Sequence, residues 1–380
     1  MAKVKLFFQK LYKNIIMAIK TPNRKQKTIY FNLLRTLSAV IIALIITCMI
    51  LIFASDKPFS AIKALLFSPF KSKFWIGEIF RGFVPLVFAG VAASIMLKCG
   101  QFNMIGEGSF YIGGLVGALV AIYLPVSSFL AVIIACIAAI LITALFGLIP
   151  ALLKAKLNVS EFVVSLMLNF IILWVGMYFL QTYFRDEASG DIATRIIPYS
   201  NRFSILVPGT YLSTGIIVAL IIVILAGIFL YKTKFGYMIR VTGNNLDFAK
   251  YSGLPVVSTI VFSQLIGSSI AGLGGAVEIL GGIDGRFSWK ALPGFGFDGF
   301  IVAILAGNNP VLVPLAALFL SYLRTGAVLM SLDTDIASEF IQIIQALIII
   351  IVAGQAFMRK LRNRVLNKKE KSIAMEEVKI

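Results

Sequence analysis

Long apolar runs separated by short polar stretches are the feature that most constrains this chain. Each run approaches the ~20 residues with which an α-helix crosses a bilayer, where the backbone must satisfy its hydrogen bonds internally. Because 59% of the chain is hydrophobic and its mean hydropathy is +0.95, we predict an all-α, polytopic transmembrane helical bundle. About ten spans are expected, at residues 36–54, 76–97, 108–123, 127–149, 162–183, 210–231, 256–280, 292–307, 311–328 and 337–356.

The basic residues indicate how these spans are oriented, because Lys and Arg gather in cytoplasmic loops. With the N-terminus inside, the inner segments carry 24 of the 35 Lys and Arg residues and the outer segments carry 9, while Arg81 and Arg324 fall within spans. This bias predicts both termini in the cytoplasm. We expect a basic N-terminal segment (1–35), a transmembrane domain (36–356) and a basic tail (357–380). The net charge of +18 is assigned to orientation and to membrane lipid, not to nucleic acid, because no soluble domain is predicted.

The polar inner segment 232–255 is predicted to be a docking element. A short helix is expected inside it, because Asn244 or Asn245 can cap its start, Gly253 can close its end and Pro255 cannot continue it. The other residues of this helix that we single out are Leu246, Asp247, Phe248, Ala249 and Tyr251. They carry more apolar surface than a loop in water needs. We therefore predict that a soluble partner docks here; the alternative is a helix lying on lipid headgroups.

Two polar stretches interrupt the apolar pattern at comparable places in the two halves of the chain. The first is GQFNMIGEGSF (100–110) and the second is LPGFGFDGF (292–300), which makes the eighth span broken or partly re-entrant. Transporters built from repeated halves often carry interrupted helices at such positions. The residues of the first break are Phe102, Asn103, Gly106, Glu107 and Gly108. We interpret it as a structural turn near the inner face, in preference to a substrate ligand.

Ionisable side chains inside spans are costly and are therefore functional candidates. Glu78 and Arg81, three residues apart, are expected to form a local ion pair, and Arg324 is expected to reach a membrane interface. Glu278 and Asp298 either line an outward-facing cavity or pair with backbone amides.

Three further segments carry predictions about surfaces and packing. Residues 56–73 are expected to form an interfacial amphipathic helix, and the outer loop 184–209 either contacts an extracytoplasmic partner or is a solvated connector. Rows of small residues on the third and seventh spans predict close helix packing. These rows are Gly113 and Gly117, and Gly267, Ala271 and Gly275.

The sequence offers no constellation for catalysis. It contains no histidine, no GxxxxGK[ST], HExxH or GxSxG motif, and its three cysteines show no CxxC spacing. No catalytic residue, no metal site and no nucleotide site of the chain's own is predicted. We expect a protein that moves a substrate and does not transform it.

Several stretches resemble a known family of transporters. QFNMIGEGSFYIGG resembles the "FNIGAEGQ" signature of the permease subunits of bacterial ABC importers for nucleosides and simple sugars, and NVSEFVVSLMLNFI (158–171) resembles their "NEVISTLMLNYIA". RVTGNNLDFAKYSGL, GLGGAVEILG and GFGFDGFIVAILAGNNP are similar to "RAVGxNPxAARYAGI", "GLAGALEVLG" and "GYGFDGIAVALLGRNNP". The matches keep the family's order from about residue 100 to 310. They look closer to the nucleoside branch than to the ribose or amino-acid branches.

The resemblance implies how the protein works and with which partners. It implies a multi-pass permease of the bacterial plasma membrane that pairs with a second, homologous permease as a heterodimer. A cytoplasmic ABC ATPase would bind the ATP, so that the permease needs no cofactor, and a substrate-binding lipoprotein or periplasmic protein would deliver substrate. The coupling helix would map onto residues 244–253.

For a nucleoside, we expect aromatic stacking and hydrogen bonds from residues along the path. The candidates are Asn169, Glu278, Phe295, Phe297 and Asp298. One alternative is a permease of the same family for a simple sugar such as ribose. Another is an ion-coupled secondary transporter, which would use a carboxylate such as Asp298 or Glu107.

Overall fold

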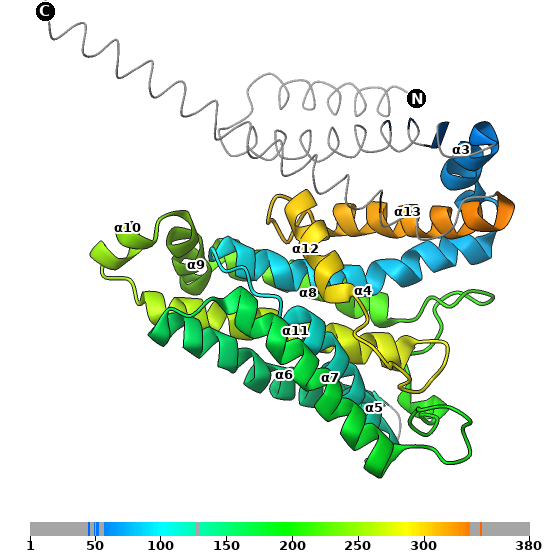
Figure 1. The fold of residues 1–380 in the computed structure, drawn as a ribbon, viewed down its shortest axis with the longest axis horizontal. Helices are drawn as coiled ribbons and strands as arrows, with labels where there is room; N and C mark the ends of the chain where they lie inside the picture. Colours follow the sequence, from blue (N-terminus) through cyan, green and yellow to red (C-terminus); the bar gives the residue numbers. More distant parts are fainter. Residues whose placement is uncertain are drawn as a thin grey trace, which may run out of the picture.

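The computed structural model describes residues 57–126 and 129–334, with Ile45, Met49, Leu51, Ile52 and Ile343 as isolated positions. Within these residues every named element is a helix, in agreement with the predicted all-α class. The α-helices are α3 (Pro58–Phe67), α4 (Lys73–Lys98), α5 (Gly106–Tyr123), α6 (Phe129–Leu157), α7 (Glu161–Phe179), α8 (Gly215–Lys232), α9 (Lys234–Asn244), α10 (Leu246–Tyr251), α11 (Val256–Gly281), α12 (Phe295–Leu305) and α13 (Val313–Asp333) (Figure 1).

Seven of the described helices are long and apolar enough to cross a membrane: α4, α5, α6, α7 with its continuation to Phe184, α8, α11 and α13. Each coincides with a predicted span, although α6 extends eight residues beyond the predicted end. Apart from the isolated positions named above, the predicted first and tenth spans (36–54 and 337–356), the N-terminal segment and the basic tail lie outside the described residues.

The eighth predicted span is short, as the polar break in its sequence indicated. Only eleven residues form α12, which corresponds to about 16 Å of helix, whereas the hydrocarbon core is about 30 Å thick. The first three residues of the predicted span, Leu292 to Gly294, are not helical, and Gly294 adopts a left-handed backbone conformation (φ +84°) directly before the helix. A residue with a Cβ is strained there, so glycine suits the start of α12.

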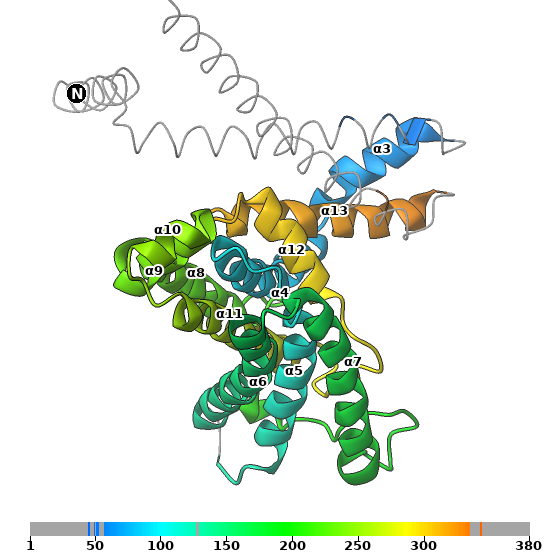
Figure 2. The same ribbon diagram turned by 60° about the vertical axis from the view of Figure 1, so that its left-hand side comes forward.

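Helix α11 lies at the centre of the bundle and packs against α4, α5 and α6 (Figure 2). The predicted rows of small residues make this close approach possible. A Cβ on Gly113 of α5 would overlap the backbone of Gly272, and a Cβ on Gly275 would overlap the carbonyl of Phe110. The prediction of close packing along α11 is confirmed.

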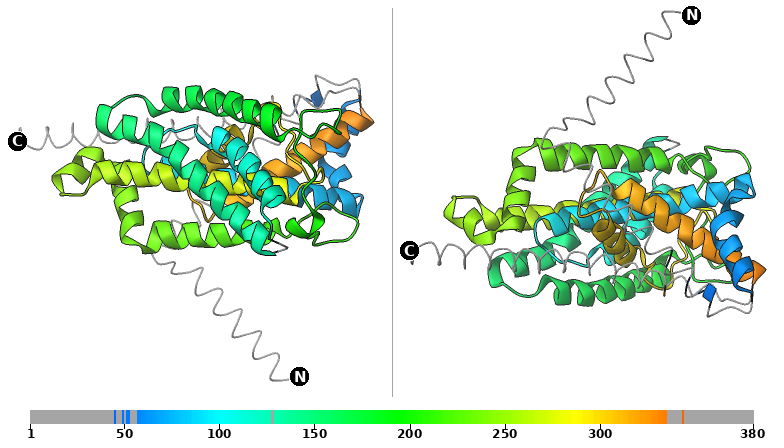
Figure 3. Two further views of the ribbon diagram at one scale, coloured as in Figure 1. Left: turned by 90° about the horizontal axis from the view of Figure 1, so that it is seen from below. Right: turned by 90° about the horizontal axis from the view of Figure 1, so that it is seen from above.

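The two ends of the bundle differ in character. Helices α9 and α10 project from one end, and the loops 184–209 and 281–291 lie at the other (Figures 1 and 3). The basic segment 232–255 belongs to the first end, which the positive-inside rule assigns to the cytoplasm. The two outer loops hold each other through backbone bonds, Thr194 N–H to the Phe287 carbonyl and Ile197 N–H to the Gly285 carbonyl.

A surface ion pair adds to this contact between the outer loops. The Lys290 ammonium lies 2.5 Å from the Asp191 carboxylate. Its hydrogen bond holds the pKa of Asp191 below the usual range for an aspartate. Loop 184–209 is therefore tied to a neighbouring loop over part of its length, and its contact with an extracytoplasmic partner stays a prediction.

Within the segment 56–73, which was predicted to be an interfacial helix, the α-helix is shorter: it is α3, and it packs against α13. Ala61, Ala64 and Leu65 are buried together with Ala327 and Met330 of α13. Phe59 and Phe67 remain exposed on the opposite side. This helix therefore packs on α13 while it presents aromatic side chains outward, as an amphipathic helix at a membrane surface does.

Candidate functional site

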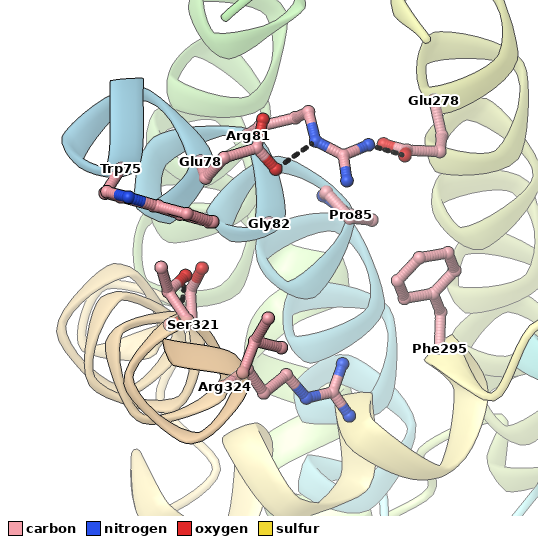
Figure 4. Close-up of a pocket in the computed structure, with 11 residues that line it drawn as sticks. Trp75, Glu78, Arg81, Gly82, Pro85, Glu278, Phe295, Ser321 and Arg324 are labelled. Atoms are coloured by element: carbon pink, nitrogen blue, oxygen red, sulfur yellow. Dashed lines mark hydrogen bonds and ion pairs between the residues drawn. The ribbon is translucent and has the colours of Figure 1, made fainter. Parts of the chain in front are cut away.

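A cavity of about 260 Å³ opens between the outer halves of α4 and α13 (Figure 4). Side chains from four helices surround it: Trp75, Glu78, Arg81, Gly82 and Pro85 of α4, Glu278 of α11, Phe295 of α12, and Ser321, Arg324, Thr325 and Val328 of α13. Its wall combines aromatic rings with both signs of charge. In a bundle, such convergent polar groups in an otherwise apolar environment mark a ligand site.

The α4 wall follows from helical periodicity. Trp75, Glu78, Gly82 and Pro85 recur at intervals of three and four residues, so they share one face. On that face the Glu78 carboxylate accepts a hydrogen bond from Arg81 Nε at 3.0 Å, which confirms the predicted local ion pair.

Arg81 also connects two helices. Its Nη1 lies 3.8 Å from the Glu278 carboxylate on α11, so one guanidinium lies between two carboxylates (Figure 4). A second cavity, of about 330 Å³, lies on the side of the loop 282–289, and it shares only Arg81 and Glu278 with the first. The Arg81–Glu278 pair therefore stands at the boundary between a loop-side cavity and a deeper one.

The opposite wall carries a second ion pair. Arg324 Nη2 of α13 lies 2.5 Å from the Asp298 carboxylate in the first turn of α12. Ser321, one turn earlier, donates to the Ile79 carbonyl at 2.6 Å and so ties α13 to α4. Arg324 was expected to reach toward a membrane interface; the structure instead places it in an ion pair at the cavity, because α12 brings a carboxylate within its reach.

The two polar breaks of the sequence meet in the structure. Glu107, at the start of α5, is buried, and its carboxyl oxygens accept the backbone N–H groups of Gly294 and, at 2.6 Å, of Gly296. These N–H groups open α12 and have no partner within the helix. A Cβ on Gly296 would overlap Glu107, so glycine is needed for this approach. The predicted structural role of Glu107 thus has a definite form: it closes the N-terminus of the broken helix.

A polar row on α7 holds the first break in place. Ser165 Oγ accepts the Met104 N–H, and the Asn169 side chain both accepts the Gly108 N–H at 3.0 Å and donates to the Met104 carbonyl at 2.9 Å. Glu161, one turn before Ser165, accepts the Phe102 N–H at 3.2 Å. Spacing of four residues puts these three side chains on one face. Asn103 completes the arrangement, donating to Gln264 of α11 at 2.6 Å.

The predicted path residues therefore divide into two groups. Glu278 and Phe295 line the cavity, and Asp298 reaches it through Arg324. Asn169 is buried at the first break with both ends of its amide bonded to backbone, and Phe297 is half exposed on another side of α12. Neither belongs to the described lining of the cavity, and a substrate role for these two residues stays a prediction.

Six lining residues were not singled out from the sequence: Trp75, Gly82, Pro85, Ser321, Thr325 and Val328. Trp75 and Ser321 each lie three positions before a charged residue that was noticed, Glu78 and Arg324, and Thr325 lies one turn after Ser321. Polar residues that recur at helical spacing within an apolar span were therefore the sequence signal that could have identified them. Among the described residues, no three His, Cys, Asp or Glu side chains gather as metal ligands do.

At the cytoplasmic end, α9 and α10 make up most of the segment 232–255, for which docking of a soluble partner stays a prediction. The Asn245 side chain caps α10 by accepting the Phe248 N–H at 3.0 Å, while Asn244 is the last residue of α9. Gly253, two residues after the end of α10, adopts φ +74°, as a glycine that closes a helix does. Ala249 is buried, whereas Phe248 and Tyr251 expose 58% and 92% of their surface.

Comparison with known proteins identifies the family. The profile of the family described as "Branched-chain amino acid transport system / permease component" matches residues 75–353. The guanosine ABC transporter permease protein NupP of Bacillus subtilis is 31% identical over 339 residues, which cover 89% of this chain and 97% of that protein. The glucose ABC transporter permease protein TsgB13 of Haloferax volcanii is 30% identical, covering 85% and 87%.

The nucleoside ABC transporter permease protein NupB of Lactococcus lactis is 29% identical over 326 residues, covering 83% of this chain and 89% of that protein. No solved structure matches the chain. The family profile and these relatives span the helices that form the cavity and the docking element. The chain therefore belongs to the permease-component family of branched-chain amino acid transport systems, and it is a multi-pass protein of the bacterial plasma membrane.

Proposed function

We propose that this chain is the membrane-spanning subunit of an ATP-driven ABC importer for nucleosides, and that a separate cytoplasmic ATPase binds and hydrolyses the ATP. The observation that carries this proposal is the capped helix α10, which projects from the cytoplasmic end of a permease-family bundle with Phe248 and Tyr251 exposed. Exposed aromatic side chains on a short rigid helix are typical of anchors at protein interfaces.

The structure supports a mechanical role for this docking element. Gly243, near the end of α9, packs so closely on α4 that a Cβ there would overlap the backbone of Lys98 and Cys99. Beside α10 lies a hollow of about 780 Å³ whose lining includes Lys156 and Lys250, which would complement an acidic partner surface. A displacement of α9 and α10 by the ATPase would therefore press directly on the inner end of α4, whose outer half lines the cavity.

The same proposal includes two further partners. A substrate-binding lipoprotein or periplasmic protein would dock on the outer loops, where a polar hollow is lined by charged residues, namely Arg185, Asp186, Glu187 and Arg195. A second, homologous permease would complete a heterodimer; this part of the proposal is supported by the resemblance to nucleoside permeases. Alternating access would then follow from relative movement of the helices around the cavity.

The nature of the cavity supports a nucleoside as substrate. Trp75 and Phe295 supply aromatic surface on which a base can stack, and Glu278 supplies a hydrogen-bond acceptor. Two of the relatives are named as permeases for guanosine and for nucleosides. The second candidate is a simple sugar, which is favoured by the similarity to a glucose permease.

An ion-coupled mechanism finds less support. It requires a carboxylate that binds the driving ion, and Glu107 and Asp298 were the candidates for this role. Glu107 accepts two backbone N–H groups and Asp298 pairs with Arg324. Both carboxyl groups thus already have partners that a bound cation would have to replace.

Uptake of radiolabelled guanosine into proteoliposomes that contain the complete transporter tests the proposal. We expect uptake to require ATP, and Phe248→Ala or Asp247→Arg in the docking element to uncouple ATP hydrolysis from uptake while the protein stays folded. Labelled glucose and ribose are measured in parallel, since uptake of a sugar alone would support the second candidate. Uptake that follows an imposed ion gradient without ATPase, and that is unchanged by both substitutions, would refute the importer.

A further inference from the structure

One oxygen of Glu78 has no partner although it is buried. Glu78 Oε2 accepts the hydrogen bond of Arg81, whereas Oε1 has almost no solvent contact and no hydrogen bond in the described residues. A buried acceptor without a donor costs free energy, so such an atom in a native structure calls for an explanation. Here the explanation is provided by its position, because Glu78 lines the cavity between α4 and α13.

The surroundings of this oxygen suit a ligand that is both planar and rich in hydrogen-bond donors. Trp75 lies one turn before Glu78 on the same face of α4, and Phe295 lies across the cavity on α12 (Figure 4). The unpartnered Glu78 oxygen, close to these two aromatic side chains, matches the hydroxyl and N–H groups of a nucleoside.

The charges around the cavity set a limit on the ligand. Glu78, Glu278 and Asp298 supply three carboxylates, and Arg81 and Arg324 supply two guanidinium groups. Both guanidinium groups are engaged by these carboxylates. A phosphate group would therefore meet an excess of negative charge and no uncommitted cation from this set, and like charges at short distance repel strongly where water is scarce.

We propose that Glu78 is a specificity-determining residue whose Oε1 accepts a hydrogen bond from an uncharged nucleoside stacked near Trp75, and that the surplus of carboxylates excludes phosphorylated nucleosides. This inference rests on the proposed nucleoside transport and assigns the contact and the selectivity to named groups. The Arg81–Glu278 pair, at the boundary with the loop-side cavity, lies where the substrate would enter.

Direct binding to the membrane complex tests the inference. The complete permease–ATPase complex is reconstituted in nanodiscs without its binding protein, so that selectivity of that protein does not contribute, and binding of radiolabelled guanosine is measured with guanosine 5′-monophosphate as competitor. Glu78→Gln keeps an oxygen for Arg81 but replaces the free acceptor by a donor. We expect guanosine binding to weaken roughly ten- to hundredfold, and the monophosphate to compete at least a hundredfold less well than guanosine.

Two more variants keep the test decisive. Trp75→Leu leaves the ion pairs intact and is expected to weaken guanosine binding about five- to hundredfold through lost stacking. Asp333→Asn removes an exposed carboxylate at the end of α13, outside the cavity, and serves as the control with unchanged binding. If either Glu78→Gln or Trp75→Leu binds guanosine as the wild type does, or if the monophosphate competes as well as guanosine, the inference is wrong.

Parallel uptake measurements separate this inference from the proposed function. ATP-dependent guanosine uptake by the wild type, together with unchanged guanosine binding in Glu78→Gln, would overturn the Glu78 assignment and leave the proposed importer function standing. Absence of any ATP-dependent nucleoside uptake would overturn both.

Discussion

Replacing Glu107 by glutamine is the sharpest test of how the two breaks are joined. In the wild type each carboxyl oxygen accepts one backbone N–H, from Gly294 and Gly296. This is the pattern of an ionised carboxylate, which is an acceptor at both oxygens. Glutamine keeps one oxygen and turns an NH2 group toward the other N–H. One hydrogen bond is lost and two donors face each other.

The expected loss of stability follows from these contacts. A hydrogen bond to a charged group contributes about 1.5–3 kcal/mol, and a buried donor without a partner costs about 1–3 kcal/mol. Because the two contributions overlap, we expect Glu107→Gln to lower the free energy of unfolding by about 2–4 kcal/mol. Phe295 and Asp298 flank Gly296 in the same helical turn, so we also expect the KM for uptake to rise.

The assay is unfolding of the purified permease in mild detergent by titration with SDS, followed by tryptophan fluorescence. Glu187→Gln is the matched control, because Glu187 is exposed in the outer loop and surface substitutions stay within about 0.5 kcal/mol. If Glu107→Gln also stays within about 0.5 kcal/mol of the wild type, the carboxyl group does not hold α12, and the reasoning is refuted.

Three further predictions concern packing and chemistry elsewhere. Asn169→Ala removes the hydrogen bonds to Gly108 and Met104. We expect it to lower the free energy of unfolding by about 1–3 kcal/mol without raising the KM for uptake. A raised KM at unchanged stability would instead support a substrate role for Asn169. In Gly275→Val the new side chain should collide with the Phe110 carbonyl, and we expect the free energy of unfolding, measured by the same SDS titration, to fall by about 1–3 kcal/mol. Gly190 has open space around it, so Gly190→Val should leave the free energy of unfolding unchanged. Equal stability of the two variants would contradict close packing at Gly275. Burial raises the pKa of Cys99 to about 11, so little thiolate is present at pH 8. In a Cys48→Ala, Cys136→Ala background, we therefore expect a maleimide to label the native protein far more slowly than the SDS-denatured protein. Equally fast labelling of both would show that the Cys99 thiol is accessible.

The local features of this protein could be predicted from the sequence because they depend on neighbouring residues. Apolar runs of span length predict α4 through α8, α11 and α13, since helix formation in a bilayer depends on contiguous apolar residues. The caps of α10 depend on Asn245 and Gly253, one residue before the helix and two after it. The family, too, is readable from motifs of about ten residues.

The candidate site was decided by tertiary structure, because its contacts join residues far apart in the chain. Arg81 meets Glu278, and Glu107 meets Gly294 and Gly296, only once α11 and α12 lie beside α4 and α5. Periodicity tells which residues share a face, but it does not tell which face meets which. Glu278 and Phe295 could thus be named as candidates by residue type, whereas the cavity that unites them with Trp75 and Glu78 depends on how four helices cross.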